Sequence, residues 1–166
     1  MDGRSRLLRF HEQSPVPAER RASHDLSTFP YDPAARITAT VEPTASRSIA
    51  LAHSAAGATR AFAFGVTRFR LGGTAVALTL FQLDDYAGGV FLPFRDLTNG
   101  VATYGGGRYL LDTAKGADLG GSNGTVMLDF NFAYQPSCAF SERWSCPLAP
   151  PENHLDVAVN AGEKLP

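Results

Sequence analysis

A hydrophobic pattern with a period of two residues runs through most of this chain from Arg36 onward. It is clearest over Thr125–Phe132, where four apolar residues alternate with polar ones that include Asp129 and Asn131. It begins at Arg36–Val41, where Ile37, Ala39 and Val41 share one face. Successive side chains of a strand point to opposite faces of a sheet, so this period predicts half-buried β-strands and excludes a helical core.

Breaks in the pattern predict where strands turn. Gly72 and Gly73 join two apolar runs and tolerate positive φ, which predicts a hairpin. The apolar positions change parity near Gly65–Thr67, which predicts a bulge or corner there. Further strands are expected at Ser48–His53, Arg60–Val66, Thr74–Leu83, Val90–Phe94, Val101–Tyr104, Arg108–Asp112 and Leu155–Val159, with polar loops at Asp84–Gly89 and Thr113–Gly124.

Together these segments predict an all-β fold, an antiparallel barrel or sandwich of about eight or nine strands. Thr74–Leu83 is apolar on both faces and is expected to be a central strand. Leu155–Val159 is expected to close the sheet. Before Pro30 the chain is charged and sparse in apolar residues, which predicts two short helical pieces, the second at Ala18–His24. We expect residues 1–30 to form an N-terminal helical and extended segment that packs on a single β domain of residues 31–166.

Charge and hydropathy exclude several classes of partner. The chain of 166 residues has 15 basic and 16 acidic residues, without the basic excess of a protein that neutralises nucleic-acid phosphates. Its strongest apolar run, Thr74–Leu83, is too short to cross a bilayer, and Met1–Phe10 lacks the apolar stretch of a secretory signal. We therefore expect a soluble cytoplasmic protein without nucleic-acid or membrane partners.

Five motifs in the second half of the chain occur in a specific order: FLPFRDLTNG, TYGGGRYL, LDFNFAYQPSCAF, CPLAPPENHL and AGEK. With the earlier SPVP and FPYDPAARITATVEP, the chain resembles the bacterial and archaeal family known as domain of unknown function 1684. The resemblance implies no activity, substrate or cofactor, so function must come from the residues themselves.

Polar residues follow several of the expected strands after Val90 and form the candidate ligand site. Arginine binds carboxylate or phosphate through two N–H groups, and the amides of Gly105–Gly107 add donors. We predict that Arg95, Arg108, Asp129 and Asn131 converge on one polar site open to solvent. The alternative is an internal network in which the arginines satisfy buried carboxylates such as Asp96, Asp112 or Asp129. The full candidate set is Arg95, Thr98, Arg108, Tyr109, Asp129, Asn131 and His154.

Cys138, Cys146 and His154 follow one another at intervals of eight residues. Structural zinc sites usually pair cysteines at much shorter spacings, so we predict no metal site. Buried thiols are the favoured interpretation, and a disulfide or a catalytic thiol with His154 as its base are alternatives. The three glycines lack the lysine and hydroxyl residue of a phosphate-binding loop, and no cofactor is expected.

The leading functional hypothesis is a binding module with a polar pocket for a small anionic or carbonyl-bearing ligand. The second is an enzyme in the same pocket, with Asp129, Glu152 or His154 for proton transfer or a cysteine as nucleophile. The third is a structural or interaction domain without a ligand.

Overall fold

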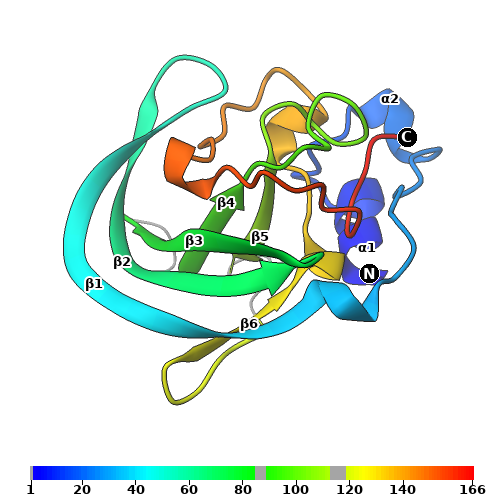
Figure 1. Cartoon of the computed structure of the whole chain (residues 1–166). Helices are drawn as coiled ribbons and strands as arrows, with labels where there is room; N and C mark the ends of the chain where they lie inside the picture. Colours follow the sequence, from blue (N-terminus) through cyan, green and yellow to red (C-terminus); the bar gives the residue numbers. More distant parts are fainter. Residues whose placement is uncertain (1, 85–88, 113–118) are drawn as a thin grey trace.

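A computed structural model describes residues 2–84, 89–112 and 119–166, and it confirms the all-β prediction. Most of the loops predicted at Asp84–Gly89 and Thr113–Gly124 lies outside these residues. The strands form one antiparallel sheet in the order β5-β4-β3-β2-β1-β6, curled into a half-barrel (Figure 1). They are β1 (Arg36–Ala52), β2 (Ala58–Leu71), β3 (Thr74–Leu83), β4 (Val90–Phe94), β5 (Arg108–Asp112) and β6 (Thr125–Asp129).

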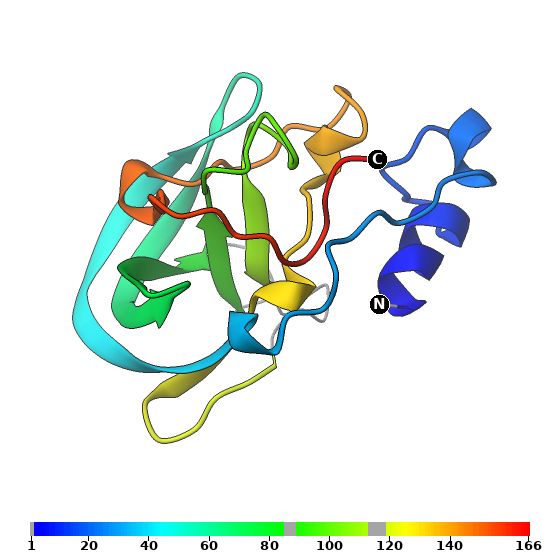
Figure 2. The ribbon, with the colours of Figure 1, turned by 45° about the vertical axis from the view of Figure 1, so that its right-hand side comes forward.

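The strong curvature of β1 shapes this sheet, as Figures 1 and 2 show. Its first residues, Arg36–Thr40, pair with β6, and its later residues pair with β2 as far as Ala52. The ladder to β6 ends at Thr40 and the ladder to β2 begins at Val41, and the β2 ladder shifts register between Pro43 and Arg47. Such irregularities bend a strand, so one strand serves both sides of the half-barrel. The two strands predicted at Arg36–Val41 and Ser48–His53 are thus parts of β1.

The described residues contain six strands rather than eight or nine, because two predicted strands merge in β1 and two others are irregular. Val101–Tyr104 lies in a tight loop in which the carbonyl of Thr98 accepts the N–H groups of Val101, Ala102 and Thr103. Leu155–Val159 runs beside the chain that follows β4, where the N–H of Leu155 donates to Arg95 and the N–H of Leu97 donates to Val157. These bonds tie the segment to the sheet without forming a regular strand.

Both predicted turns of β2 are confirmed. Leu71 pairs with Thr74 across Gly72 and Gly73, which have φ of +56° and +83°. The register of β2 against β3 shifts between Ala63 and Gly65, within one residue of the predicted corner. A Cβ on Gly65 would lie 2.8 Å from Cγ1 of Val41 and 3.3 Å from the carbonyl oxygen of Glu42, so the glycine lets β1 approach β2 closely.

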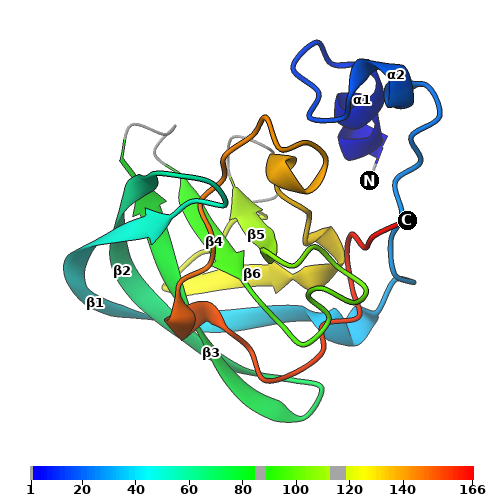
Figure 3. The same cartoon turned by 90° about the horizontal axis from the view of Figure 1, so that it is seen from above.

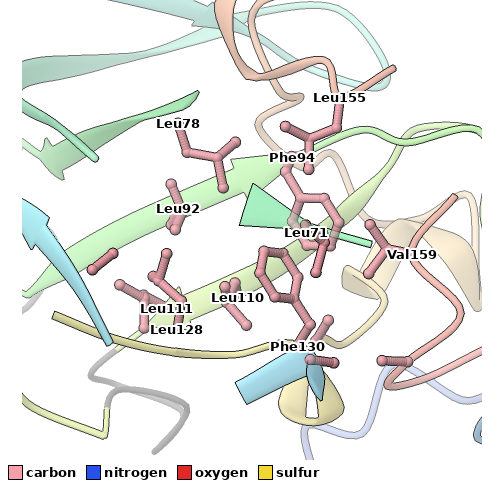
Figure 4. Packing of buried hydrophobic residues seen from close by; sticks show 14 of the residues in the cluster. Leu71, Leu78, Leu92, Phe94, Leu110, Leu111, Leu128, Phe130, Leu155 and Val159 are labelled. Atoms are coloured by element: carbon pink, nitrogen blue, oxygen red, sulfur yellow. The ribbon is translucent and has the colours of Figure 1, made fainter. Parts of the chain in front are cut away.

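Two hydrophobic clusters stabilise the fold. The first fills the inside of the half-barrel and includes Leu78, Leu92, Phe94 and Leu128 (Figure 4). The second includes Phe81, Leu83, Phe91, Tyr109 and Tyr134. β3 contributes to both from its alternating positions, which confirms that it is buried on both faces.

The strand predicted over Thr125–Phe132 ends early, at Asp129. The Asp129 carboxylate accepts the backbone N–H of Asn131 at 3.1 Å and caps a 3-10 turn, η3 (Phe130–Phe132). This local hydrogen bond competes with the strand ladder. The alternation is therefore lost: Asn131 is buried and Phe132 is 39% exposed.

The α-helices of the described residues precede Pro30, as predicted. They are α1 (Asp2–Phe10) and α2 (Ala18–Arg21), which stand to one side of the sheet near the C-terminal tail (Figure 3). The fully buried Leu8 and the ion pair between Arg4 Nε and Glu163 Oε1, at 2.7 Å, attach α1 to the rest of the chain.

No helix among the described residues is long and apolar enough to cross a membrane. Other 3-10 turns of the described residues are η1 (Pro33–Ala35), η4 (Ser137–Ala139) and η5 (Pro151–Asn153).

Candidate functional site

Arg108 lies in an internal network, as in the alternative interpretation of the arginines. Its side chain has no exposed surface and forms an ion pair with Asp96 at 3.0 Å, which is equally buried. The guanidinium also donates to the carbonyl oxygens of Val159, Ala161 and Glu163. Burial lowers the pKa of Arg108, and the nearby Asp96 carboxylate opposes that shift. The arginine therefore fastens the C-terminal tail to the sheet and does not open to solvent.

Gly107 makes this placement of Arg108 possible. It has φ of +95°, and a Cβ there would lie 2.5 Å from the carbonyl oxygen of Phe94. The glycine allows a close approach between the start of β5 and the end of β4.

Asp129 and Asn131 form a second, separate network. The Asn131 side chain donates to the Asp129 carboxylate and to the backbone oxygen of Asp32, both at 2.8 Å, and its oxygen accepts the N–H of Asp32. Arg36 lies 3.7 Å from Asp129 as an ion pair. These groups fix the chain at the start of β1. The structure therefore does not bring the two arginines, Asp129 and Asn131 together in one open site.

The other predicted site residues are also dispersed. Thr98 is buried and its hydroxyl contacts that of Thr103 at 2.8 Å. Arg95 is partly exposed, and its backbone pairs with Asn153 and Leu155. His154 is exposed, with its Nε2 atom 3.3 Å from the carbonyl oxygen of Ala149. Of the seven predicted residues, Tyr109 alone lines the pocket described next.

A pocket of about 560 Å³ lies where the N-terminal segment, the open end of the sheet and the chain around residue 145 meet. This volume is in the range typical of sites for small molecules. Its lining residues are Arg4, Leu7, His11, Gln13, Pro15, His53, Thr59, Leu83, Asp84, Phe91, Tyr109, Asp112, Ser137, Trp144, Ser145, Cys146 and Pro147.

The wall around Ser145 is held by backbone pairing to the end of β1. The N–H of Ser54 donates to the carbonyl of Cys146 at 2.9 Å, and the N–H of Leu148 donates to the carbonyl of Ala52 at 2.8 Å. His53 and Pro147 form an antiparallel bridge. This pairing places Ser145 beside the His53 side chain.

The polar part of the wall is a cluster of one imidazole and two hydroxyl groups. His53 Nδ1 lies 3.1 Å from Ser145 Oγ, and His53 Nε2 lies 2.7 Å from Thr59 Oγ1. A neutral imidazole has one N–H and one acceptor nitrogen, so one hydroxyl donates to the ring while the other accepts from it. In either tautomer the accepting hydroxyl keeps its own hydrogen for another acceptor.

The charged groups of the pocket are already engaged. Asp112 accepts the Tyr134 hydroxyl at 2.6 Å, and burial followed by the Asp112 charge raises the pKa of Tyr134 well above its usual value. Asp84 is paired with Arg60, and Arg4 is paired with Glu163. Tyr109 donates to the carbonyl of Pro147 at 2.6 Å and packs edge-on against Phe91.

Sequence reasoning missed most of these pocket residues, because they come from separate parts of the chain. His53 ends a predicted strand and Ser145 lies 92 residues later in a segment without periodicity. No local motif joins them. The one available signal was that His53 ends a predicted strand, which is a common position for a histidine on any surface.

Within the described residues, no group of three or more histidine, cysteine, aspartate or glutamate side chains is arranged to hold a metal ion. Cys138 and Cys146 are thiols rather than a disulfide. Cys146 is buried, as favoured from the sequence, whereas Cys138 is partly exposed.

The fold and the pocket define a half-barrel β protein with a small side pocket at its open end. The chain belongs to the family of proteins of unknown function called DUF1684, whose profile matches residues 22–164. It is similar to an uncharacterized protein of Haloarcula marismortui whose solution NMR structure is known, at 39% identity and a TM-score of 0.74 over 99% of this chain and 89% of that one. No curated protein matches the chain.

Proposed function

We propose that the protein is a binding module whose pocket holds a small carbonyl-bearing molecule. The observation that carries the proposal is the cluster of His53, Ser145 and Thr59 on the pocket wall, which retains a hydroxyl donor in either tautomer of the imidazole. A carbonyl oxygen is the complementary acceptor. Phe91 and Trp144 line the same pocket and provide apolar contact for the body of the ligand.

The charges of the pocket favour a neutral ligand over an anionic one, the other kind predicted from the sequence. Asp84 and Asp112 line the pocket, and Arg4 is neutralised by Glu163. A bound anion would have to compete with Glu163 for Arg4, whereas a neutral carbonyl needs only a hydroxyl donor. The near balance of 15 basic and 16 acidic residues argues against a nucleic-acid partner.

The test compares phenylacetamide with phenylacetate, which share a ring and a carbonyl and differ in charge. Titrations followed by two-dimensional NMR are expected to show tighter binding of phenylacetamide, with shifts at Thr59, Trp144 and Ser145. A Thr59→Val, Ser145→Ala variant loses the hydroxyl donors and is expected to bind about 2- to 10-fold more weakly, the range for one neutral hydrogen bond. His154→Ala, at an exposed residue outside the pocket lining, is the matched control.

Tighter binding of phenylacetate would favour the anionic ligand instead. Shifts outside the pocket, or no shifts with either probe, would contradict the binding module and favour a structural or interaction domain. Native mass spectrometry of protein purified without added ligand identifies any natural ligand that is retained.

A further inference from the structure

Two thiols meet beside the pocket, and the binding proposal does not use them. The backbone N–H of Cys138, in η4, donates to Sγ of Cys146 at 3.2 Å. Cys146 lines the pocket and Cys138 is partly exposed, so the pair is accessible from one side.

Hydrogen-bond donors surround the Cys138 sulfur. Hydrogen bonds from the side chains of Cys146, Ser54 and Tyr104 lower the pKa of Cys138 to about 6, against a smaller opposing effect of burial. Burial and the contact with Cys138 raise the pKa of Tyr104 to about 12, so its phenol stays protonated and remains a donor. A cysteine in this setting is largely a thiolate at neutral pH.

The backbone holds the two sulfurs together from independent anchors. Ser54 Oγ accepts the N–H of Cys146 at 3.1 Å, and the Ser54 N–H binds the Cys146 carbonyl. Cys138 is placed by its own 3-10 turn, where the N–H of Ala139 donates to Pro136. Tertiary structure therefore holds Cys146 Sγ against the backbone of Cys138.

We propose that Cys138 and Cys146 are a peroxide-reducing dithiol, with Cys138 as the nucleophile and Cys146 as the resolving thiol. The Cys138 thiolate attacks the terminal oxygen of a hydroperoxide, the O–O bond breaks, and the leaving alkoxide takes a proton to become an alcohol. Cys138 is thereby oxidised by two electrons to a sulfenic acid. Cys146 then attacks that sulfur, forming the disulfide and releasing water. A dithiol reductant restores both thiols by exchange.

The choice of nucleophile follows from exposure and hydrogen bonding. Cys138 is the more exposed sulfur and receives the Ser54 and Tyr104 donors. Cys146 is 7% exposed, and its Sγ lies 3.2 Å from the backbone nitrogen of Cys138, which places it beside the nucleophile as a resolving thiol must be. This activity is independent of the carbonyl-bearing ligand, because it requires neither His53 nor the pocket hydroxyls.

The test uses the full-length protein, fully reduced and freed of reductant, with one equivalent of tert-butyl hydroperoxide. Both thiols are expected to disappear, and the intact mass to fall by about 2 Da as a disulfide forms. In Cys146→Ser the reaction stops at the sulfenic acid, which dimedone traps at Cys138. Cys138→Ser is expected to react at least about tenfold more slowly than the wild type, since its remaining thiol lacks the donors that favour the thiolate.

A Ser54→Ala, Tyr104→Phe variant separates reactivity from structure. It is expected to fold, by circular dichroism, and to react more slowly than the wild type. Arg68→Gln, at an exposed residue of β2 outside the pocket lining, is the matched control and is expected to react with the peroxide as fast as the wild type.

Two results would overturn the proposal. The first is a rate of reaction with the peroxide that is no faster for the folded wild type than for the same chain unfolded in urea. This comparison needs no variant. The other is dimedone labelling of wild type or Cys146→Ser at a residue other than Cys138.

Discussion

Arg108 carries a charge that the protein encloses completely. Its ion pair with Asp96 and its bonds to three backbone carbonyls replace the water that a guanidinium would otherwise hold. Asp96 in turn accepts the N–H groups of Thr98 and Val159. One ion pair thus joins β5, the loop after β4 and the C-terminal tail. The role of Arg108 is therefore structural, and its side chain is not exposed to bind a ligand.

Arg108→Met is expected to lower the free energy of unfolding by about 3–5 kcal/mol, because it leaves the buried Asp96 carboxylate without its cation. Urea unfolding followed by fluorescence measures the loss. Arg95→Met, at a partly exposed arginine, is the control and is expected to change stability by at most about 0.5 kcal/mol. An Arg108→Met protein as stable as the wild type would show that the network contributes nothing to the fold.

At the scale of the elements, the contact between β1 and β2 depends on Gly65. Gly65→Ala is expected to destabilise the protein by about 1–3 kcal/mol, because its Cβ would overlap Val41 Cγ1. Adding Val41→Ala removes that atom and is expected to recover part of the loss in a double-mutant cycle. Gly105→Ala, which meets only the Cα of Gly100 at 4.0 Å, is the matched control. Simple additivity of the two changes would contradict the close contact.

Alternation predicts well the strands that lie inside the sheet and have a neighbouring strand on each side. β2, β3 and their hairpin follow the expected pattern because Gly72 and Gly73 supply the required φ values. Val101–Tyr104 was predicted wrongly because the Thr98 carbonyl draws three successive N–H groups into a loop. The end of β6 was missed because the Asp129 side chain competes with the ladder.

The candidate site was harder to predict for a reason that belongs to the whole molecule. Its polar cluster joins the β1–β2 hairpin to the segment around Ser145, and the N-terminal segment covers it through residues such as Leu7 and His11. Their proximity depends on the curl of the sheet and on pairing between His53 and Pro147. The polar residues near the ends of predicted strands therefore suggested Arg108 and Asp129 as site residues, but both side chains are buried and form ion pairs within the fold.

The whole-molecule stability is expected to depend on pH through Cys138. The fold lowers the pKa of this thiol from 9.0 to about 6, with its hydrogen bonds to Cys146, Ser54 and Tyr104 outweighing burial. Between about pH 6 and 9 the unfolded chain therefore binds more protons at this group than the folded chain, so stability rises with pH. The contribution of Cys138 to stability is complete above the pKa of the thiol in the unfolded chain, and it is lost as the pH falls through the pKa of the thiol in the folded chain. Partial exposure of Cys138 reduces its size.

Urea unfolding under reducing conditions at pH 6, 7.5 and 9 measures this effect in the wild type and in Cys138→Ser. The difference in the free energy of unfolding between the two proteins is expected to shift in favour of the wild type as pH rises. The other titratable groups are present in both proteins and cancel in the difference, and Tyr104, with a pKa of about 12, does not titrate in this range. A difference that stays constant from pH 6 to 9 would show that the fold does not stabilise the thiolate, because only a thiol whose pKa differs between the folded and unfolded chains makes stability depend on pH in this window.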